Sequence, residues 1–246
     1  MSENLERRSF IIGTAAVCLS TGVALLASGC DPITPPGDCN PEEPLPPLPP
    51  SSPDPDDPFG IDLNINMGTI DSYLNRSDVV YRDLRMLVGL TGDEGIESSF
   101  SVDDMLNGFR IVPFPYLAKL PNNAMEGSFS GETLISIEYD ANENIVSHRF
   151  LYEESLLVLT DLFPKDKAIF LVCKLGDHAG LLRKLLIRLG WDAKSIYNVG
   201  GMWAYTGTKI QEILVYPSQA GGNKMYATWR ADYATIDFSL LHQAKP

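Results

Sequence analysis

An uninterrupted apolar run from Ala168 to Val172 is the feature that most constrains the fold of this chain. Such a run, without polar alternation, is typical of a strand buried on both faces of a parallel sheet. After a short loop, leucines recur on one stripe at helical spacing: Leu181, Leu182, Leu185, Leu186 and Leu189. Gly190 suits the C-terminal cap of that helix, and residues 195–199 predict another strand. Strand, helix and strand in this order form a βαβ unit, so we expect a parallel sheet here.

Further patterns indicate an α/β domain. Residues 79–81 predict a short strand that leads into Asp83-Leu84-Arg85. Residues 133–139 and 145–151 flank a polar turn and predict a β-hairpin, and residues 225–240 are strand-like. The expected fold is therefore a central, mainly parallel sheet flanked by helices, with an inserted β-hairpin.

The loop between the apolar strand and the helix carries a cysteine, Cys173, at its start. Unpaired backbone amides at a helix start stabilise a negative charge, which predicts a lowered thiol pKa and a nucleophilic thiolate. Lys174 adds a positive charge nearby, and Gly176 allows the loop to curl without a side chain in the way. The alternative is a buried structural cysteine at a strand end.

Residues 168–207 resemble the rhodanese family. The loop Cys173–Ala179 fits the pattern C-x-x-G-x-x-[AS], and the strand that follows the helix leads into Gly200-Gly201-Met202-Trp203. Asp83-Leu84-Arg85 matches a D-[VL]-R segment after an early strand of that family. With long insertions, the resemblance extends over roughly residues 62–207.

The resemblance implies a rhodanese-like fold and covalent sulfur transfer. A small donor would give a sulfane sulfur to Cys173, and a thiol acceptor would then remove it from the persulfide. The substrate-binding loop would comprise Lys174, Leu175, Gly176, Asp177, His178 and Ala179. No cofactor and no metal are implied.

Two loop residues depart from the usual pattern. His178 stands where many members of the family have arginine, so it is either a partly charged donor or a solvated residue without a role. Asp177 beside it disfavours an anionic donor such as thiosulfate.

Other residues near the loop are expected to be structural. Asp83 and Arg85 predict a buried or rim ion pair that ties loops together, and Trp203 is expected to pack beneath the loop. Gly200 and Gly201 are expected to serve turn geometry near Cys173.

Two rival functions remain open, and a third is disfavoured. The disfavoured one is a phosphatase or arsenate reductase, whose loop needs an arginine at the seventh position, which Ala179 occupies here. A non-catalytic rhodanese-like binding or redox-sensing module would use the insertions as a partner surface. In a redox role, Cys173 would pair with Cys39.

The first 29 residues predict a signal peptide. Arg7-Arg8-Ser9-Phe10-Ile11 resembles the twin-arginine signal and opens an uncharged stretch that ends at Ala27. Leu26-Ala27-Ser28-Gly29-Cys30 resembles a lipobox, in which Cys30 would be acylated and anchor the protein to a bacterial membrane. Ordinary cleavage to a secreted or periplasmic protein, or an uncleaved anchor, are the alternatives. All three place the rest of the chain outside the cytoplasm.

Residues 30–58 predict an acidic, Pro-rich tether before a folded part at 59–246. Residues 31–58 hold 12 prolines and seven acidic residues without Lys or Arg, a composition that favours extended polyproline II. The chain carries a net charge of −13, so we expect no nucleic-acid partner. No C-x-x-C spacing is present, and the three histidines are scattered, so a zinc site is not expected.

Overall fold

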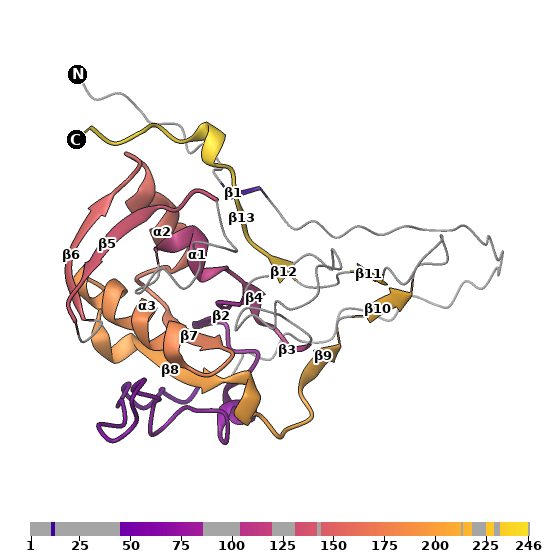
Figure 1. Cartoon of the computed structure of the whole chain (residues 1–246). Coiled ribbons are helices and arrows are strands. Elements are labelled where there is room, and N and C mark those ends of the chain that lie inside the picture. Colours follow the sequence, from indigo (N-terminus) through magenta and orange to yellow (C-terminus); the bar gives the residue numbers. More distant parts are fainter. Residues whose placement is uncertain are drawn as a thin grey trace, which may run out of the picture.

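The computed structural model describes residues 11–12, 45–85, 104–119, 131–141, 144–212, 214–217, 225–228 and 232–245 (Figure 1). Three of the cysteines, Cys18, Cys30 and Cys39, lie outside these residues, as do most of the expected signal peptide and the first part of the expected tether. Among the described residues, no helix has the length and apolar character needed to span a bilayer.

A five-stranded sheet in the order β12-β4-β2-β7-β8 forms the centre of the domain. Its four strand pairings are all parallel. The strands are β2 (Val79–Asp83), β4 (Arg110–Ile111), β7 (Ala168–Cys173), β8 (Ile196–Gly201) and β12 (Asp232–Tyr233). The predicted βαβ unit and the parallel sheet around it are confirmed.

Alternate residues of β7 pack on opposite faces of this sheet. Ile169, Leu171 and Cys173 belong to one hydrophobic cluster, whereas Phe170 and Val172 belong to a second. All five side chains are at most 1% exposed. The strand is therefore buried on both faces, as its apolar run predicts.

The α-helices pack on the face that includes Cys173. They are α1 (Phe114–Leu117), α2 (Ser155–Leu162) and α3 (Asp177–Arg188). Leu182, Leu185 and Leu186 of α3 are fully buried against the sheet, and the helix is followed by Gly190 at φ 92°. The predicted leucine stripe and glycine cap are therefore both present.

We expected helices on both faces of the sheet, but the opposite face is covered by the N-terminal segment and by a short strand. There the N-terminal segment contributes Ile65, Met67 and Ile70, the last within the short 3-10 helix η1 (Ile70–Tyr73). Met105 and Leu106 of β3 (Asp104–Leu106) complete this cluster, and β3 pairs with β9 (Ile210–Glu212). In Figure 1 this N-terminal segment lies on the far side of β8 from α3. Among the described residues, this cluster contains no α-helix.

The inserted hairpin is present as predicted, with β5 (Ile135–Tyr139) antiparallel to β6 (Ile145–Phe150). A second antiparallel pair joins β10 (Leu214–Pro217) to β11 (Met225–Thr228). A third joins β13 (Thr235–Ile236) to β1 (Ile11–Ile12), which lies within the expected signal peptide. The remaining 3-10 helices are η3 (Ala193–Ser195), η4 (Met202–Ala204) and η5 (Phe238–Leu240).

The second half of the Pro-rich segment lies against the domain. The hydroxyl of Tyr197 donates to the Pro49 carbonyl at 2.6 Å, and Arg76 donates to the Pro46 carbonyl at 2.8 Å. The backbone N–H of Ser51 donates to the Lys194 carbonyl at 2.9 Å. Of the expected tether, only residues 30–44 remain as a possible free spacer, and they lie outside the described residues.

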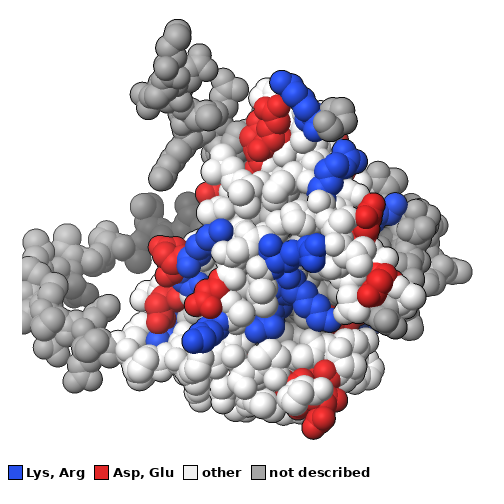
Figure 2. Space-filling model, turned by 90° about the vertical axis from the view of Figure 1, so that its left-hand side faces the viewer, with Lys and Arg blue, Asp and Glu red and all other residues white. Residues whose placement is uncertain are grey.

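The surface charge of the folded part is mixed. Figure 2 shows basic side chains gathered near the middle of one face, with acidic side chains nearer its edges. The acidity of the whole chain comes in large part from the Pro-rich segment, so it does not make this face acidic.

Candidate active site at the Cys173 loop

Three sequence features that are far apart in the chain meet at one edge of the sheet. In the parallel register, Asp83 of β2 lies beside Val172 of β7, and Cys173 lies beside Gly201 of β8. This is the carboxyl-terminal edge of the strands, where ligands of open α/β sheets bind.

The sulfur of Cys173 is enclosed by its own loop. The Gly176 N–H donates to Sγ at 3.0 Å, and the thiol donates to Oδ1 of Asp177 at 3.3 Å. The backbone of Ala179, which is fully buried, also forms a hydrogen bond that favours the thiolate. Cys173 is 0% exposed, so the expected cradle of amides is present but closed to solvent.

The environment of the thiol raises its pKa, contrary to the expectation of a lowered value. Burial is the main cause of a Cys173 pKa of about 12, and the negative charge of Asp177 adds to it. The amides of Gly176 and Ala179 act in the opposite direction and are outweighed. The resting state of this cysteine is therefore the neutral thiol.

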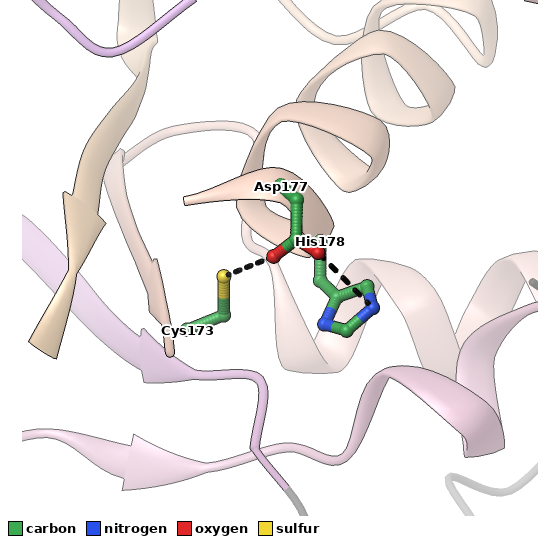
Figure 3. Close-up of side chains that lie close together, drawn as sticks. All are labelled: Cys173, Asp177 and His178. Atoms are coloured by element: carbon green, nitrogen blue, oxygen red, sulfur yellow. Dashed lines mark hydrogen bonds and ion pairs between the residues drawn. The ribbon is translucent and has the colours of Figure 1, made fainter. Parts of the chain in front are cut away.

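His178 fits neither of the two interpretations drawn from the sequence. It is 5% exposed, so it is not a solvated loop residue. Its ring stacks on Phe114 with centroids 5.5 Å apart, and its Nε2 lies 3.7 Å from Oδ2 of Asp177. Burial lowers the His178 pKa, so the ring supplies no positive charge for an anionic donor near neutral pH. Figure 3 shows the Asp177 carboxylate lying between the sulfur and this ring.

Glycines in the loop and at the end of β8 allow the loop to pass close over the ends of the strands. Gly176 and Gly200 have φ values of 105° and 108°, in the left-handed region that favours glycine. A Cβ on Gly201 would lie 2.3 Å from the Lys174 carbonyl oxygen, because the loop crosses directly over this residue. Gly200 and Gly201 thus shape the turn beneath Cys173.

Asp83 and Arg85 form a buried ion pair. Arg85 donates from Nε to Oδ1 at 3.0 Å and from a terminal nitrogen to Oδ2 at 2.7 Å. Their side chains are 0% and 4% exposed. The Leu84 N–H between them donates to the Val172 carbonyl, which ties this pair to the strand that ends in Cys173.

Trp203 does not pack beneath the loop. The residue is 80% exposed, and its backbone N–H donates to the Lys174 carbonyl at 3.2 Å. Leu175 beside it is 46% exposed, and Lys174 is half-buried. Together, Leu175 and Trp203 form an exposed apolar rim on the loop.

Known proteins add no independent identification. No family model matches the chain, and no curated protein and no solved structure matches it. The rhodanese resemblance rests on the quoted residues alone, so what it implies for function is a proposal.

Sequence reasoning missed one residue that positions the loop. Asn198 is fully buried in β8, and its side-chain amide donates to the Gly176 and Phe59 carbonyls, each at 2.9 Å. Its side-chain oxygen accepts the Gly200 N–H at 3.1 Å. A single amide within an otherwise apolar strand was the signal that could have revealed it.

Proposed function

We propose that this chain is an extracytoplasmic sulfurtransferase with a rhodanese-like domain, which carries a sulfane sulfur as a persulfide on Cys173. The observation that carries the proposal is the 3.0 Å hydrogen bond from the Gly176 N–H to Sγ, where a buried parallel strand meets a helix. Main-chain donors in this position stabilise negative charge on the attacking sulfur and on the persulfide.

The proposed reaction conserves atoms and needs no external oxidant. Asp177 accepts the thiol proton, and the Cys173 thiolate attacks the outer sulfur of an organic persulfide donor. The donor S–S bond breaks, a new S–S bond forms on Cys173, and the departing thiolate takes the proton. An acceptor thiolate then attacks the outer sulfur of Cys173, which regenerates the enzyme and yields an acceptor persulfide.

The electrostatics favour such a donor over thiosulfate. The Asp177 carboxylate lies 3.3 Å from the sulfur, and the neighbouring imidazole of His178 is buried. Thiosulfate would bring two negative charges beside this carboxylate, whereas an organic persulfide need bring none at its sulfur. We therefore expect small-thiol persulfides to load Cys173 faster than thiosulfate.

Access to the sulfur requires movement of the loop. Because Cys173 has no exposed surface, no donor contacts it until a neighbouring side chain shifts. The Asp177 side chain is 29% exposed, and Leu175 is 46% exposed, so the loop offers partly exposed residues at this point. Opening at the loop also hydrates the sulfur, which lowers its pKa by removing the dominant cause of the shift.

The deciding experiment is intact mass spectrometry of the full chain after incubation with a small-thiol persulfide. We expect a gain of one sulfur atom that is lost in Cys173→Ser and retained in the control Cys39→Ser. A wild-type protein whose Cys173 alkylates fully in denaturant, but gains no sulfur when folded, would overturn the sulfurtransferase.

A non-catalytic binding or redox-sensing module is the second candidate function. The observation that favours it is the complete burial of Cys173 together with its raised pKa of about 12. This candidate predicts no turnover between a persulfide donor and an acceptor thiol. It also predicts that Cys173→Ser leaves partner binding unchanged, whereas turnover lost in that variant favours the enzyme.

Location outside the cytoplasm and acylation at Cys30 complete the proposal. The support is the twin-arginine-like segment followed by the lipobox-like residues before Cys30. Residues 31–44 would then separate the membrane from the packed segment that begins at Leu45. Metabolic labelling with a lipid precursor should mark the wild type and not Cys30→Ser; equal labelling, or none in either, contradicts the lipoprotein.

A further inference from the structure

We propose that Cys173, Asp177 and His178 form a three-ligand site for a thiophilic divalent cation of the Zn²⁺ class. One ligand atom from each residue, a sulfur, a carboxylate oxygen and an imidazole nitrogen, lies within 4.8 Å of the other two. Sulfur, nitrogen and oxygen donors are the set that Zn²⁺ takes in proteins, and three protein ligands leave a fourth position open. Figure 3 shows the three side chains converging from the end of β7 and the start of α3.

The donor atoms lie near the spacing that such an ion requires, with one Asp177 oxygen close to the sulfur and the other close to the imidazole. Tetrahedral Zn²⁺ with bonds of about 2.0–2.3 Å holds its ligand atoms about 3.5 Å apart. The sulfur is 3.3 Å from Oδ1 of Asp177, and Oδ2 of Asp177 is 3.7 Å from Nε2 of His178. The widest separation allowed in the cluster, 4.8 Å, exceeds the required spacing by little more than 1 Å, so binding needs only a small closure.

The fold holds the three ligands in place before any ion arrives. Cys173 is the last residue of a buried strand, and Asp177 is the first residue of a 12-residue helix. The His178 ring is stacked on the buried Phe114, and the Gly176 N–H donates to the ligand sulfur. Hydrogen bonds and packing behind the ligands of this kind orient metal sites in proteins and strengthen them.

The charges within the site also favour a cation. A carboxylate 3.3 Å from a cysteine disfavours a second free anion, but two anionic ligands together neutralise a divalent ion. The spacing of the site, Cys-x-x-x-Asp-His, is not one of the paired-cysteine patterns that predict zinc sites from sequence.

One consequence rests on the proposed function. An ion held by the Cys173 sulfur occupies the atom that would attack a donor, so the cation would inhibit sulfur loading. The metal site itself does not depend on sulfur transfer.

The test is titration of the full chain with Zn²⁺ by calorimetry and with Co²⁺ by absorption. We expect one ion per chain and a thiolate-to-cobalt charge-transfer band that is absent in Cys173→Ser. That variant keeps Cys18, Cys30 and Cys39, so it also reports any binding at those thiols. His178→Gln should weaken binding at least tenfold, whereas the control His242→Gln, which removes an exposed histidine beside Glu154, should leave it unchanged.

The wild-type protein separates this proposal from the proposed function. Asp177→Asn removes a metal ligand and also the base of the proposed transfer, so metal affinity should fall at least tenfold and sulfur loading should slow as well. If the folded wild type has a free thiol but shows no cobalt band and no calorimetric binding, the metal site is wrong, whatever the outcome of sulfur loading. Binding that persists in Cys173→Ser with wild-type affinity also overturns it. Circular dichroism of each variant checks that loss of binding is not loss of fold.

Discussion

Two polar clusters, the first fully buried and the second partly exposed, lie at the ends of neighbouring strands, and their charges are arranged differently. At the end of β2, the Asp83 carboxylate is paired with Arg85 through two charge-assisted hydrogen bonds. At the end of β7, the Asp177 carboxylate faces the Cys173 thiol and the His178 ring, whose pKa is lowered by burial. The first cluster is balanced within the fold, and the second has an excess of negative charge. This difference separates a cluster that stabilises the domain from one suited to a ligand.

The largest effect is expected from breaking the balanced cluster. Arg85→Met leaves the fully buried Asp83 carboxylate without its guanidinium, which should reduce the free energy of unfolding by about 3–5 kcal/mol. Urea denaturation followed by circular dichroism measures it.

The control for that experiment is a more exposed ion pair. Asp78 is 48% exposed and paired with Arg76, so Asp78→Asn should reduce the free energy of unfolding by less than about 1 kcal/mol. Adding Asp83→Asn to Arg85→Met should recover part of the loss, because the buried charge is then gone. Equal losses in Arg85→Met and Asp78→Asn would show that the two clusters do not differ as described.

The next largest loss of stability is expected from removing the Asn198 amide, which holds the loop of the second cluster. Asn198→Ala removes buried hydrogen bonds to the Gly176 carbonyl and from the Gly200 N–H, and a partly buried one to the Phe59 carbonyl. Buried groups left unpaired each cost roughly 1–3 kcal/mol, so we expect a total of about 3 kcal/mol after partial hydration. Hydrogen exchange should show faster exchange in residues 174–179. Unchanged exchange there would mean that the amide does not hold the loop.

A smaller effect is expected from the loop's close approach to β8. The methyl group in Gly201→Ala would meet the Lys174 carbonyl oxygen at 2.3 Å, so the loop must lift, at a cost of about 2 kcal/mol. The thiol of Cys173 should then alkylate faster at pH 8. Gly68→Ala, where the nearest contact is a side-chain oxygen at 3.3 Å, is the control: it should cost less stability than Gly201→Ala and leave the alkylation rate of Cys173 unchanged.

Local periodicity was enough to predict β2, β7, β8, α3 and the hairpin, because apolar runs and leucine stripes can be recognised within a short stretch of sequence. It did not predict β4, which has only two residues. The pKa of Cys173 was not predictable in this way. Cys173 belongs to a buried cluster that includes Phe114 of α1, about 60 residues earlier in the chain, and Phe114 also stacks on His178. Helix-start amides favour a thiolate, but here the cost of burial outweighs them.

The packed part of the Pro-rich segment was missed for a different reason. Proline lacks a backbone donor but keeps its carbonyl acceptor. The prolines are therefore held by donors from the domain: the hydroxyl of Tyr197 and the guanidinium of Arg76 donate to the Pro49 and Pro46 carbonyls. The composition of the segment does not show which side chains of the domain will donate hydrogen bonds to its carbonyls.

The smallest effect is expected at the exposed rim of the second cluster. Because the Trp203 ring is 80% exposed, Trp203→Ala should change the free energy of unfolding by no more than about 0.5 kcal/mol. Trp191 is the matched control: it is 4% exposed and donates from its ring to the Phe163 carbonyl at 2.7 Å, so Trp191→Ala should cost about 3–5 kcal/mol.

If acceptors approach Cys173 across this rim, Trp203→Ala raises KM for an apolar thiol acceptor and leaves kcat unchanged. A large loss of stability in Trp203→Ala would instead indicate that Trp203 packs against the domain, as the sequence analysis expected.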